Sequence, residues 1–218
     1  LSSFDVSHLL GHGGQGTVYL AKSRHIRSDT LVAVKLIRKA EEDPKLVDLL
    51  LNEQHILQKL KGHPLILDMC ASFHDSRNFY LVTEFHSGGD LQDLLDKFKV
   101  LTPRRLRFYS AEILSGLHFL HQNGIIHRDI KPSNILVSAQ GHAIIADFGL
   151  ARLSRTSILS DDYDLNEFDR EPGSDKTLSW CGTLEYMAPE ILRREYYDNS
   201  VDLYSLGVSM FQFAEGKV

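Results

Sequence analysis

The chain has 218 residues, of which 43% are hydrophobic and 24% charged, and its formal net charge is −5. These values describe a soluble chain that can build one domain or two small lobes, and no apolar run is long enough to cross a bilayer. Because the chain is mildly acidic and has no basic stripe, we expect neither a nucleic acid nor a membrane as a partner.

Cysteine usage and the chain ends add two expectations. Cys70 and Cys181 are far apart in the sequence, so neither a disulfide framework nor a zinc site is indicated. A reducing compartment follows, and we expect a cytoplasmic or nuclear protein. The sequence starts at Leu1 without a signal-like apolar segment and ends in "LYSLGVSMFQFAEGKV", which reads as a continuing helix, so we expect a fragment of a longer protein.

The first distinctive segment is "GHGGQGTV" (11–18), in which Gly11, Gly13 and Gly16 lie between two strand-like segments. With no side chains in the way, the backbone amides here can approach a phosphate closely. A strand follows the glycines and the lysine-serine pair of a Walker A loop is missing, which argues against the two best-known glycine-rich nucleotide motifs. A glycine-rich hairpin turn without a ligand remains an alternative.

A strand and a helix follow, and each has one charge on an apolar face. The segment "LVAVKLI" (31–37) alternates with a period of two, which predicts a strand covered on both sides, and Lys35 interrupts one face. "PKLVDLLLNEQHILQKL" (44–60) predicts a helix, and Glu53 is the only acid in its apolar stripe. Because buried charges are rarely left alone, Lys35 and Glu53 can pair with each other; the alternative is that both stay solvated.

Beyond "FYLVTEFHSGGDL" (79–91), which reads as a strand running into a glycine turn, the pattern becomes mostly helical. The segment 104–121 predicts a helix, because apolar residues recur there at helical spacing. The short apolar runs at 135–137 and 143–146 predict a hairpin. The acidic segment 156–176 is predicted to be a mobile loop.

The loop "HRDIKPSN" (127–134) gathers several polar residues into eight positions. Asp129 and Lys131 are two residues apart, so in an extended loop one can accept a proton while the other steadies negative charge. Asn134 and Asp147, which follows the run "AIIA", are oxygen ligands suited to a hard cation such as magnesium. Taken singly, each of these residues could equally be a loop cap or a turn former.

The order of the motifs distinguishes these readings. The chain contains, in this order, the glycine loop, the strand lysine, the helix glutamate, "HRDIKPSN", "DFG" (147–149) and "APE" (188–190). With these motifs in this order, the chain closely resembles the eukaryotic protein kinase family from about Phe4 to its end. The resemblance implies an α+β, bilobal protein-kinase fold, with a small β-rich N-lobe at 1–85 and a helical C-lobe at 86–218. The C-lobe would be incomplete, and residues 147–190 would form the activation segment.

The resemblance also implies a role for each site residue, with ATP and Mg²⁺ bound between the lobes. Lys35 would bind the α and β phosphates and pair with Glu53, while Asp129 would orient the acceptor hydroxyl and take its proton. Lys131 would contact the transferring phosphate, Thr183 would hydrogen-bond near Asp129 and Lys131, and Asn134 and Asp147 would hold magnesium. The nucleotide would further contact Leu10, Gly11, Gly13, Gly16, Val18, Ala33, Leu136, Thr83 as gatekeeper, and the backbone of Glu84 and His86 at the hinge. An internal hydrophobic spine would comprise Leu57, Met69, His127 and Phe148, anchored by Asp202.

Lys131 together with "GTLEYMAPE" (182–190) resembles the serine/threonine class, and the nearest group is AGC, which commonly has tyrosine where His127 stands. The family resemblance implies a protein substrate. It also implies an upstream activating kinase that acts on Ser179 or, as a rival site, Thr177, with Arg128 pairing with the phosphate. An unmodified loop hydroxyl is the alternative at both positions.

Two other functions remain open at this point. A catalytically silent, kinase-like scaffold or truncated decoy is one, because the chain ends before the family's final helices and lacks the arginine that normally pairs with Glu190. A kinase for small molecules is disfavoured, because "APE" and the long segment before it belong to enzymes that act on proteins.

Overall fold

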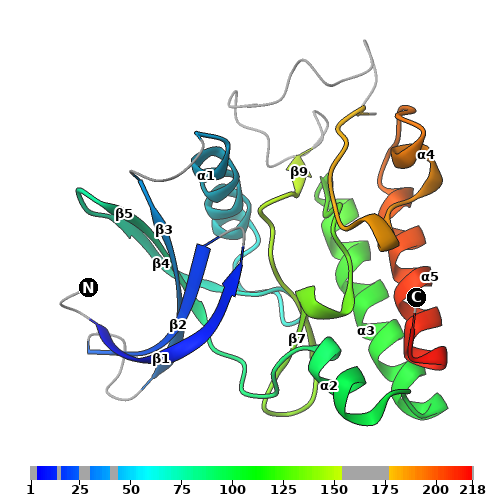
Figure 1. The fold of residues 1–218 in the computed structure, drawn as a ribbon, viewed down its shortest axis with the longest axis horizontal. Coiled ribbons are helices and arrows are strands. Elements are labelled where there is room, and N and C mark those ends of the chain that lie inside the picture. Colours follow the sequence, from blue (N-terminus) through cyan, green and yellow to red (C-terminus); the bar gives the residue numbers. More distant parts are fainter. Residues whose placement is uncertain (1–3, 14–15, 25–29, 40–43, 154–176, 218) are drawn as a thin grey trace. The chain divides into compact units, whose positions relative to one another are not determined.

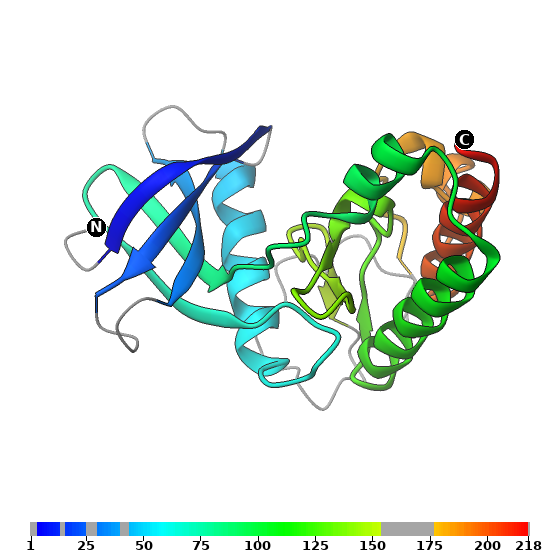
Figure 2. The same cartoon turned by 90° about the horizontal axis from the view of Figure 1, so that it is seen from below.

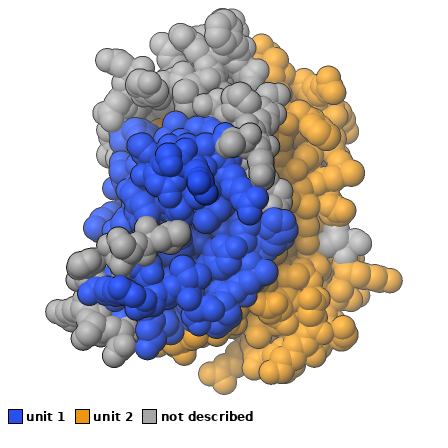
Figure 3. All heavy atoms as spheres, turned by 60° about the vertical axis from the view of Figure 1, so that its left-hand side comes forward, with its two compact units in different colours: residues 1–63, 67–85 blue, residues 64–66, 86–218 orange. Residues whose placement is uncertain are grey.

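The computed structural model describes residues 4–13, 16–24, 30–39, 44–153 and 177–217 of the chain. Its internal contacts divide the chain into two compact units (Figure 3). The first unit comprises residues 1–63 and 67–85, and the second comprises residues 64–66 and 86–218. The short segment Pro64–Ile66 thus belongs to the second unit, which no pattern in the sequence indicated.

The first unit contains a five-stranded antiparallel sheet in the order β1-β2-β3-β5-β4 (Figure 1). Its strands are β1 (Phe4–Gly13), β2 (Gly16–Ser23), β3 (Leu31–Arg38), β4 (Met69–His74) and β5 (Asn78–Glu84). The strand that was predicted at 31–37 is therefore present as β3. Valines on this sheet pack into a core cluster with Ala21 and Tyr80.

Helix α1 (Pro44–Lys59) runs beside the sheet within the first unit (Figures 1 and 2). The predicted helix at 44–60 is confirmed, and the part of its apolar stripe whose side chains are described is buried. Leu50, Leu57 and Leu60 are each at most 4% exposed, and Glu53 is 3% exposed. The helix thus carries a carboxylate into an apolar face, as its sequence indicated.

The second unit is mostly helical, and α3 and α5 pack side by side in it (Figures 1 and 2). Its helices are α2 (Leu91–Phe98), α3 (Pro103–Gln122), α4 (Pro189–Leu192) and α5 (Ser200–Glu215). Two small antiparallel pairs accompany them, β6 (Ile125–Ile126) with β9 (Arg152–Leu153) and β7 (Ile135–Val137) with β8 (Ala143–Ile145). Two single 3₁₀ turns, η1 (Pro132–Asn134) and η3 (Leu184–Tyr186), lie in the loops.

Local sequence explains where the helices of the second unit begin. Asp90 caps α2 through its side chain, which accepts from the Asp93 amide, while the Asp93 side chain accepts in return from the Asp90 amide. Thr102 caps α3, and Pro103 occupies the first helical position, where a missing N–H costs nothing. The predicted helix at 104–121 and the predicted hairpin at 135–146 are both confirmed.

One expectation about the second unit is wrong. The sequence predicts a helix that continues to the last residues, but α5 ends at Glu215 because Gly216 adopts a left-handed conformation with φ of 78°. The Gly216 amide donates to the Gln212 carbonyl, which is a common way to close a helix. None of the helices in the described ranges is long and apolar enough to span a membrane. The acidic segment 156–176, predicted to be a mobile loop, lies outside the described residues.

The stability of the second unit depends on the buried face of α3. Leu117 is fully buried, whereas Leu114, three residues earlier on the same helix, is 50% exposed. We expect Leu117→Ala to lower the free energy of unfolding by about 2–5 kcal/mol, because it removes buried methyl groups and leaves a cavity. Leu114→Ala is the matched control and should change it by less than about 0.5 kcal/mol. Urea denaturation of both variants measures the difference, and equal effects would contradict this account of the core.

Candidate functional site

The charged pair predicted in the first unit is present. Lys35 Nζ donates to Glu53 Oε2 at 2.7 Å, and the two side chains are 16% and 4% exposed. Lys35 lies on β3 and Glu53 on α1, so the pair joins the sheet to its helix. A carboxylate this deeply buried is costly without a cation, which explains why the sequence tolerates an acid in the apolar stripe.

Lys35 shares one face of the sheet with several residues that were predicted to surround the adenine. Val18 is opposite Lys35 in the β2–β3 register, and Ala33 is opposite Thr83 in the β3–β5 register. Because residues two apart on a strand point the same way, Val18, Ala33, Lys35 and Thr83 lie on the same face. Leu10 lies on β1 and is 40% exposed. Their contact with a nucleotide stays a prediction.

The predicted glycine loop joins β1 to β2. Gly11 and Gly13 lie in β1, and Gly16, which begins β2, is paired with Gly13. Gly16 has φ of 116°, and a Cβ atom there would lie 2.6 Å from the Leu36 carbonyl oxygen. Glycine is therefore required at position 16 by the backbone itself, independently of any phosphate.

Glu84 and His86 are the two predicted hinge positions, and Leu136 is a further predicted nucleotide contact. The Glu84 amide donates to the Asp68 carbonyl at 3.1 Å, so an adenine contact by Glu84 would use its carbonyl oxygen. His86 and Leu136 are half-buried residues of the second unit, and Leu136 lies on β7.

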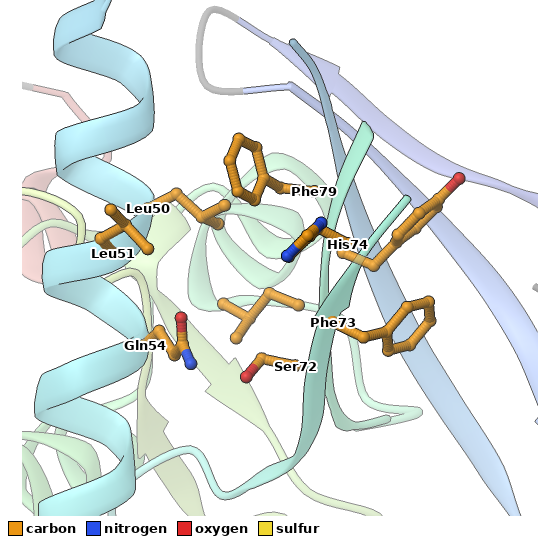
Figure 4. Close-up of a pocket in the computed structure, with 9 residues that line it drawn as sticks. Leu50, Leu51, Gln54, Ser72, Phe73, His74 and Phe79 are labelled. Atoms are coloured by element: carbon orange, nitrogen blue, oxygen red, sulfur yellow. The ribbon is translucent and has the colours of Figure 1, made fainter. Parts of the chain in front are cut away.

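A cavity of about 140 Å³ lies elsewhere in the first unit, between α1 and strands β4 and β5 (Figure 4). Leu50, Leu51 and Gln54 line it from the helix, and Ser72, His74 and Phe79 are among the strand residues that face them. Neither Lys35 nor Glu53 lines this cavity. It is therefore separate from the charged pair.

The carboxylate of Asp129 is the centre of the polar cluster in the second unit. Its Oδ2 lies 2.8 Å from Lys131 Nζ and accepts from Asn134 Nδ2 at 2.9 Å. Its Oδ1 accepts from the Thr183 amide at 2.9 Å and from the Thr183 hydroxyl at 2.7 Å. Lys131 Nζ also donates to Thr183 Oγ1 at 2.6 Å. The expectation that Asp129 and Lys131 point the same way is confirmed.

These contacts determine the charge state of Asp129. Burial of this 5%-exposed residue opposes its ionisation, but the hydrogen bond and charge of Lys131, followed by the hydrogen bond of Thr183, outweigh burial. The net result is a pKa of Asp129 below its ordinary value of 3.8. The carboxylate is therefore ionised at neutral pH and is a weak base.

Asn134 and Asp147 are brought close together by the backbone. Asn134 uses its side-chain Nδ2 for two bonds to Asp129, and its backbone carbonyl oxygen accepts from the Ala146 amide at 2.9 Å. Asp147 follows Ala146 directly, with φ of 62°. The side-chain oxygens of Asn134 and Asp147 make a donor set that fits magnesium, which prefers oxygen ligands and takes the remainder from phosphates and water. No group of three or more His, Cys, Asp or Glu among the described residues suggests another metal site.

Asp202 anchors the backbone of the loop that carries Asp129. It is fully buried, and its two oxygens accept the amides of His127 at 2.9 Å and Arg128 at 2.8 Å. The His127 ring contacts the Phe148 ring edge-on, with centroids 5.1 Å apart. Its Nδ1 accepts from the Asp129 amide at 3.3 Å, so the tautomer with hydrogen on Nε2 can donate to the Ala146 carbonyl at 3.0 Å. The second unit thus contains one part of the predicted spine, the contact of His127 with Phe148 and the anchoring by Asp202. The part formed by Leu57 and Met69 stays a prediction.

Gly182 lets the segment that carries Thr183 approach the loop 127–134. It has φ of 108°, and a Cβ atom at this position would lie 2.6 Å from the Arg128 carbonyl oxygen. Only glycine fits both restrictions without a shift of the backbone. The close approach brings Thr183 within hydrogen-bond distance of Asp129.

Sequence reasoning missed three contacts around this cluster. His121 Nε2 lies 2.8 Å from Asp202 Oδ2, and Arg152 donates to the Thr177 hydroxyl at 2.6 Å. Tyr197 donates from its hydroxyl to the Ser179 carbonyl at 2.7 Å. These contacts join residues 18 to 81 positions apart, so no local pattern could have indicated them.

The structure therefore brings Asp129, Lys131, Asn134 and Thr183 together in the second unit, with Asp147 beside them. It joins Lys35 to Glu53 in the first unit. That these two groups meet around one nucleotide stays a prediction.

Comparison with known proteins gives one family. Residues 4–218 match the protein kinase domain. A probable serine/threonine-protein kinase of Dictyostelium discoideum is 37% identical over all of this chain, which covers 44% of that protein. Protein kinase C zeta type of Oryctolagus cuniculus is 34% identical over all of this chain and 34% of its own length.

The relatives extend beyond one group of kinases. Serine/threonine-protein kinase Aurora-2 of Arabidopsis thaliana is 36% identical over 99% of this chain and 69% of its own length. The similarity thus includes the AGC member protein kinase C zeta and also an Aurora kinase. This chain spans about a third to two thirds of the length of these three relatives.

The lowered pKa of Asp129 predicts a pH-dependent stability. A carboxyl whose pKa is lower in the folded than in the unfolded state stabilises the fold above its unfolded pKa, and this contribution is lost as the pH falls through its folded pKa. Asp129→Asn removes it. We therefore expect the loss of unfolding free energy caused by Asp129→Asn to be largest near pH 7 and to shrink toward about pH 3. Urea denaturation across this range measures it, and a loss that grows as the pH falls would contradict the lowered pKa.

Proposed function

Because this chain belongs to the protein kinase family, we propose that it transfers the γ-phosphate of ATP to serine and threonine hydroxyls of protein substrates. One observation carries the proposal: the ionised Asp129 carboxylate is held against the Lys131 ammonium and the Thr183 hydroxyl. This arrangement offers an oriented acceptor for a hydroxyl proton and a positive charge for a phosphate within one small cluster. The names of the relatives support the serine/threonine class.

Asp129 serves mainly to orient the acceptor hydroxyl. With a lowered pKa it takes a proton only when the acceptor oxygen has already lost most of its electron density to phosphorus, which suits a loose transition state. Its Oδ1 exchanges a bond from Thr183 for one from the substrate hydroxyl. In this proposal Lys131, which lies 2.8 Å from Asp129, binds an oxygen of the transferring phosphate.

The remaining predicted residues bind the nucleotide and its metal in this proposal. The side-chain oxygens of Asn134 and Asp147 hold magnesium, which, when bound, neutralises phosphate charge. Lys35 binds the α and β phosphates, and Glu53 fixes the direction of its side chain through the 2.7 Å bond. Val18, Ala33 and Thr83, on the same face of the sheet as Lys35, support an adenine site there.

Free thiols support a reducing compartment, in the cytoplasm or the nucleus. Cys70 and Cys181 are both unpaired and half-buried. Disulfides are rare in such compartments, because thiols there are kept reduced.

The proposed reaction depends on the Asp129 carboxylate. We expect Asp129→Asn to lower phosphate transfer from Mg-ATP to a serine peptide library by about 100-fold or more, because the amide cannot take a proton. The matched control is Asp96→Asn, which changes an exposed carboxylate on α2 that accepts from Gln92. It should leave the rate within about twofold, as expected for an exposed surface position.

A full-length, phosphorylated sample that transfers no phosphate would overturn the proposed activity. Nucleotide binding without transfer in that sample would favour the kinase-like scaffold. Transfer that survives in Asp129→Asn would remove Asp129 from the mechanism.

Regulation by phosphorylation completes the proposal, and the geometry favours Ser179 over Thr177. Thr177 is fully buried and its hydroxyl accepts from Arg152, whereas Ser179 is half-buried. Arg128 gives two N–H bonds to Leu150 and Tyr197, which leaves further donors of its five-donor guanidinium for a phosphate. An upstream kinase is the partner that this site requires.

We expect mass spectrometry of active, cell-derived protein to find phosphate on Ser179 and not on Thr177. Ser179→Ala should lower the activity of such protein by about tenfold, the effect of losing one or two charge-assisted bonds. Ser200→Ala, at an exposed serine that begins α5, is the control and should have no effect. An active sample with both residues unmodified would reject the switch.

A further inference from the structure

Tyr197 lies between α4 and α5 and is almost completely buried. Its side chain is 2% exposed and packs in a cluster with Ile126, Met187, Ile191 and Val201. Its backbone forms an antiparallel bridge with Thr177, in which each amide donates to the other carbonyl at 3.0 Å. Tyr197 is therefore fixed at both its backbone and its ring.

The hydroxyl of Tyr197 reaches two segments at once. It donates to the Ser179 carbonyl at 2.7 Å, and it accepts from Arg128 Nη1 at 3.4 Å. Cys181 Sγ lies 3.9 Å from the same hydroxyl. One side-chain oxygen thus joins the segment before Thr183 to the residue that precedes Asp129.

The hydroxyl can keep this role over the ordinary pH range. Burial raises the pKa of Tyr197 to about 12, so the group stays protonated and remains a donor to Ser179. Arg128 is fixed as well, because its amide donates to Asp202 and its Nε donates to the Leu150 carbonyl. The bond from the Tyr197 hydroxyl consequently connects the Ser179 carbonyl to a rigid part of the second unit.

Thr183 is the end point of this connection. It lies four residues after Ser179, and its amide and hydroxyl both donate to Asp129. A displacement of the Ser179 carbonyl would be carried along the short segment Ser179–Thr183 to these two bonds. The packing of Gly182 against the Arg128 carbonyl shows how little space is available for such a displacement.

We infer that Tyr197 is a positioning residue, whose hydroxyl holds the segment Ser179–Thr183 against Arg128 and thereby sets the place of Thr183 on Asp129. The inference rests on the proposed phosphate transfer for its catalytic consequence. Its structural part, the restraint of the segment, can be measured without catalysis. Tyr197 itself touches neither reacting group.

The test removes the hydroxyl alone, by Tyr197→Phe in the full-length protein. We expect amide exchange at Thr183 to become about three- to tenfold faster, the range that one net hydrogen bond supplies. We expect kcat/KM for a serine peptide to fall by a similar factor, while KM for ATP stays within about twofold. Tyr204→Phe, at a 45%-exposed tyrosine on α5, is the matched control and should change none of these values.

The outcomes separate the inference from the proposed function. Unchanged exchange at Thr183 in a folded Tyr197→Phe variant, verified by its circular dichroism and melting temperature, overturns the restraint. Faster exchange with an unchanged kcat/KM overturns the positioning role. An equal loss of affinity for ATP would also overturn it, because that pattern indicates general loosening. A wild-type protein without any transfer activity refutes the proposed function, and the exchange measurement then still decides the restraint.

Discussion

One buried carboxylate holds the loop that carries Asp129 in place. Asp202 is fully excluded from solvent, and it accepts the amides of His127 and Arg128 and lies 2.8 Å from the His121 ring nitrogen. A buried carboxylate without partners would be strongly unfavourable, so the loop that supplies these amides is held in one conformation. Asp129 follows directly after Arg128. The position of the Asp129 carboxylate is thereby determined by an acid 73 residues later in the chain, on α5.

The first unit likewise contains a buried carboxylate that is satisfied by a specific partner. The Lys35–Glu53 bond places a cation and an anion where apolar side chains would otherwise lie. Replacing both by well-packed apolar residues of similar size would cost little stability in general, so such a pair is better explained by a function than by folding. That reasoning agrees with the role that kinases give to a lysine on the sheet, and it supports the proposed phosphate contact of Lys35.

Much of this architecture follows from local sequence. The alternation in 31–37, the helical stripe in 44–60 and the cap and proline before 104–121 each specify one element, and the structure contains all three. The pairing of Lys35 with Glu53 could be predicted because each charge interrupts an apolar face. By contrast, the end of α5 was misjudged, because Gly216 closes the helix through its own backbone conformation.

The supporting contacts of the site could not be predicted in the same way. Each of these contacts joins two distant segments through a side-chain hydrogen bond, between His121 and Asp202, Arg152 and Thr177, and Tyr197 and Ser179. An aromatic or polar residue at such a position has no periodicity or spacing that separates it from an ordinary core residue. Motif order identified the groups that do the proposed chemistry and also Asp202, whereas the contacts of His121, Arg152 and Tyr197 could be recognised only in the folded chain.

Gly182 shows how such support limits the variation of a sequence. Its left-handed backbone and its contact with the Arg128 carbonyl independently exclude any side chain. A single mutation could relieve one restriction only if the neighbouring backbone moved, and that backbone carries Asp129. Position 182 therefore has almost no freedom to drift during evolution, although it contributes no chemical group of its own.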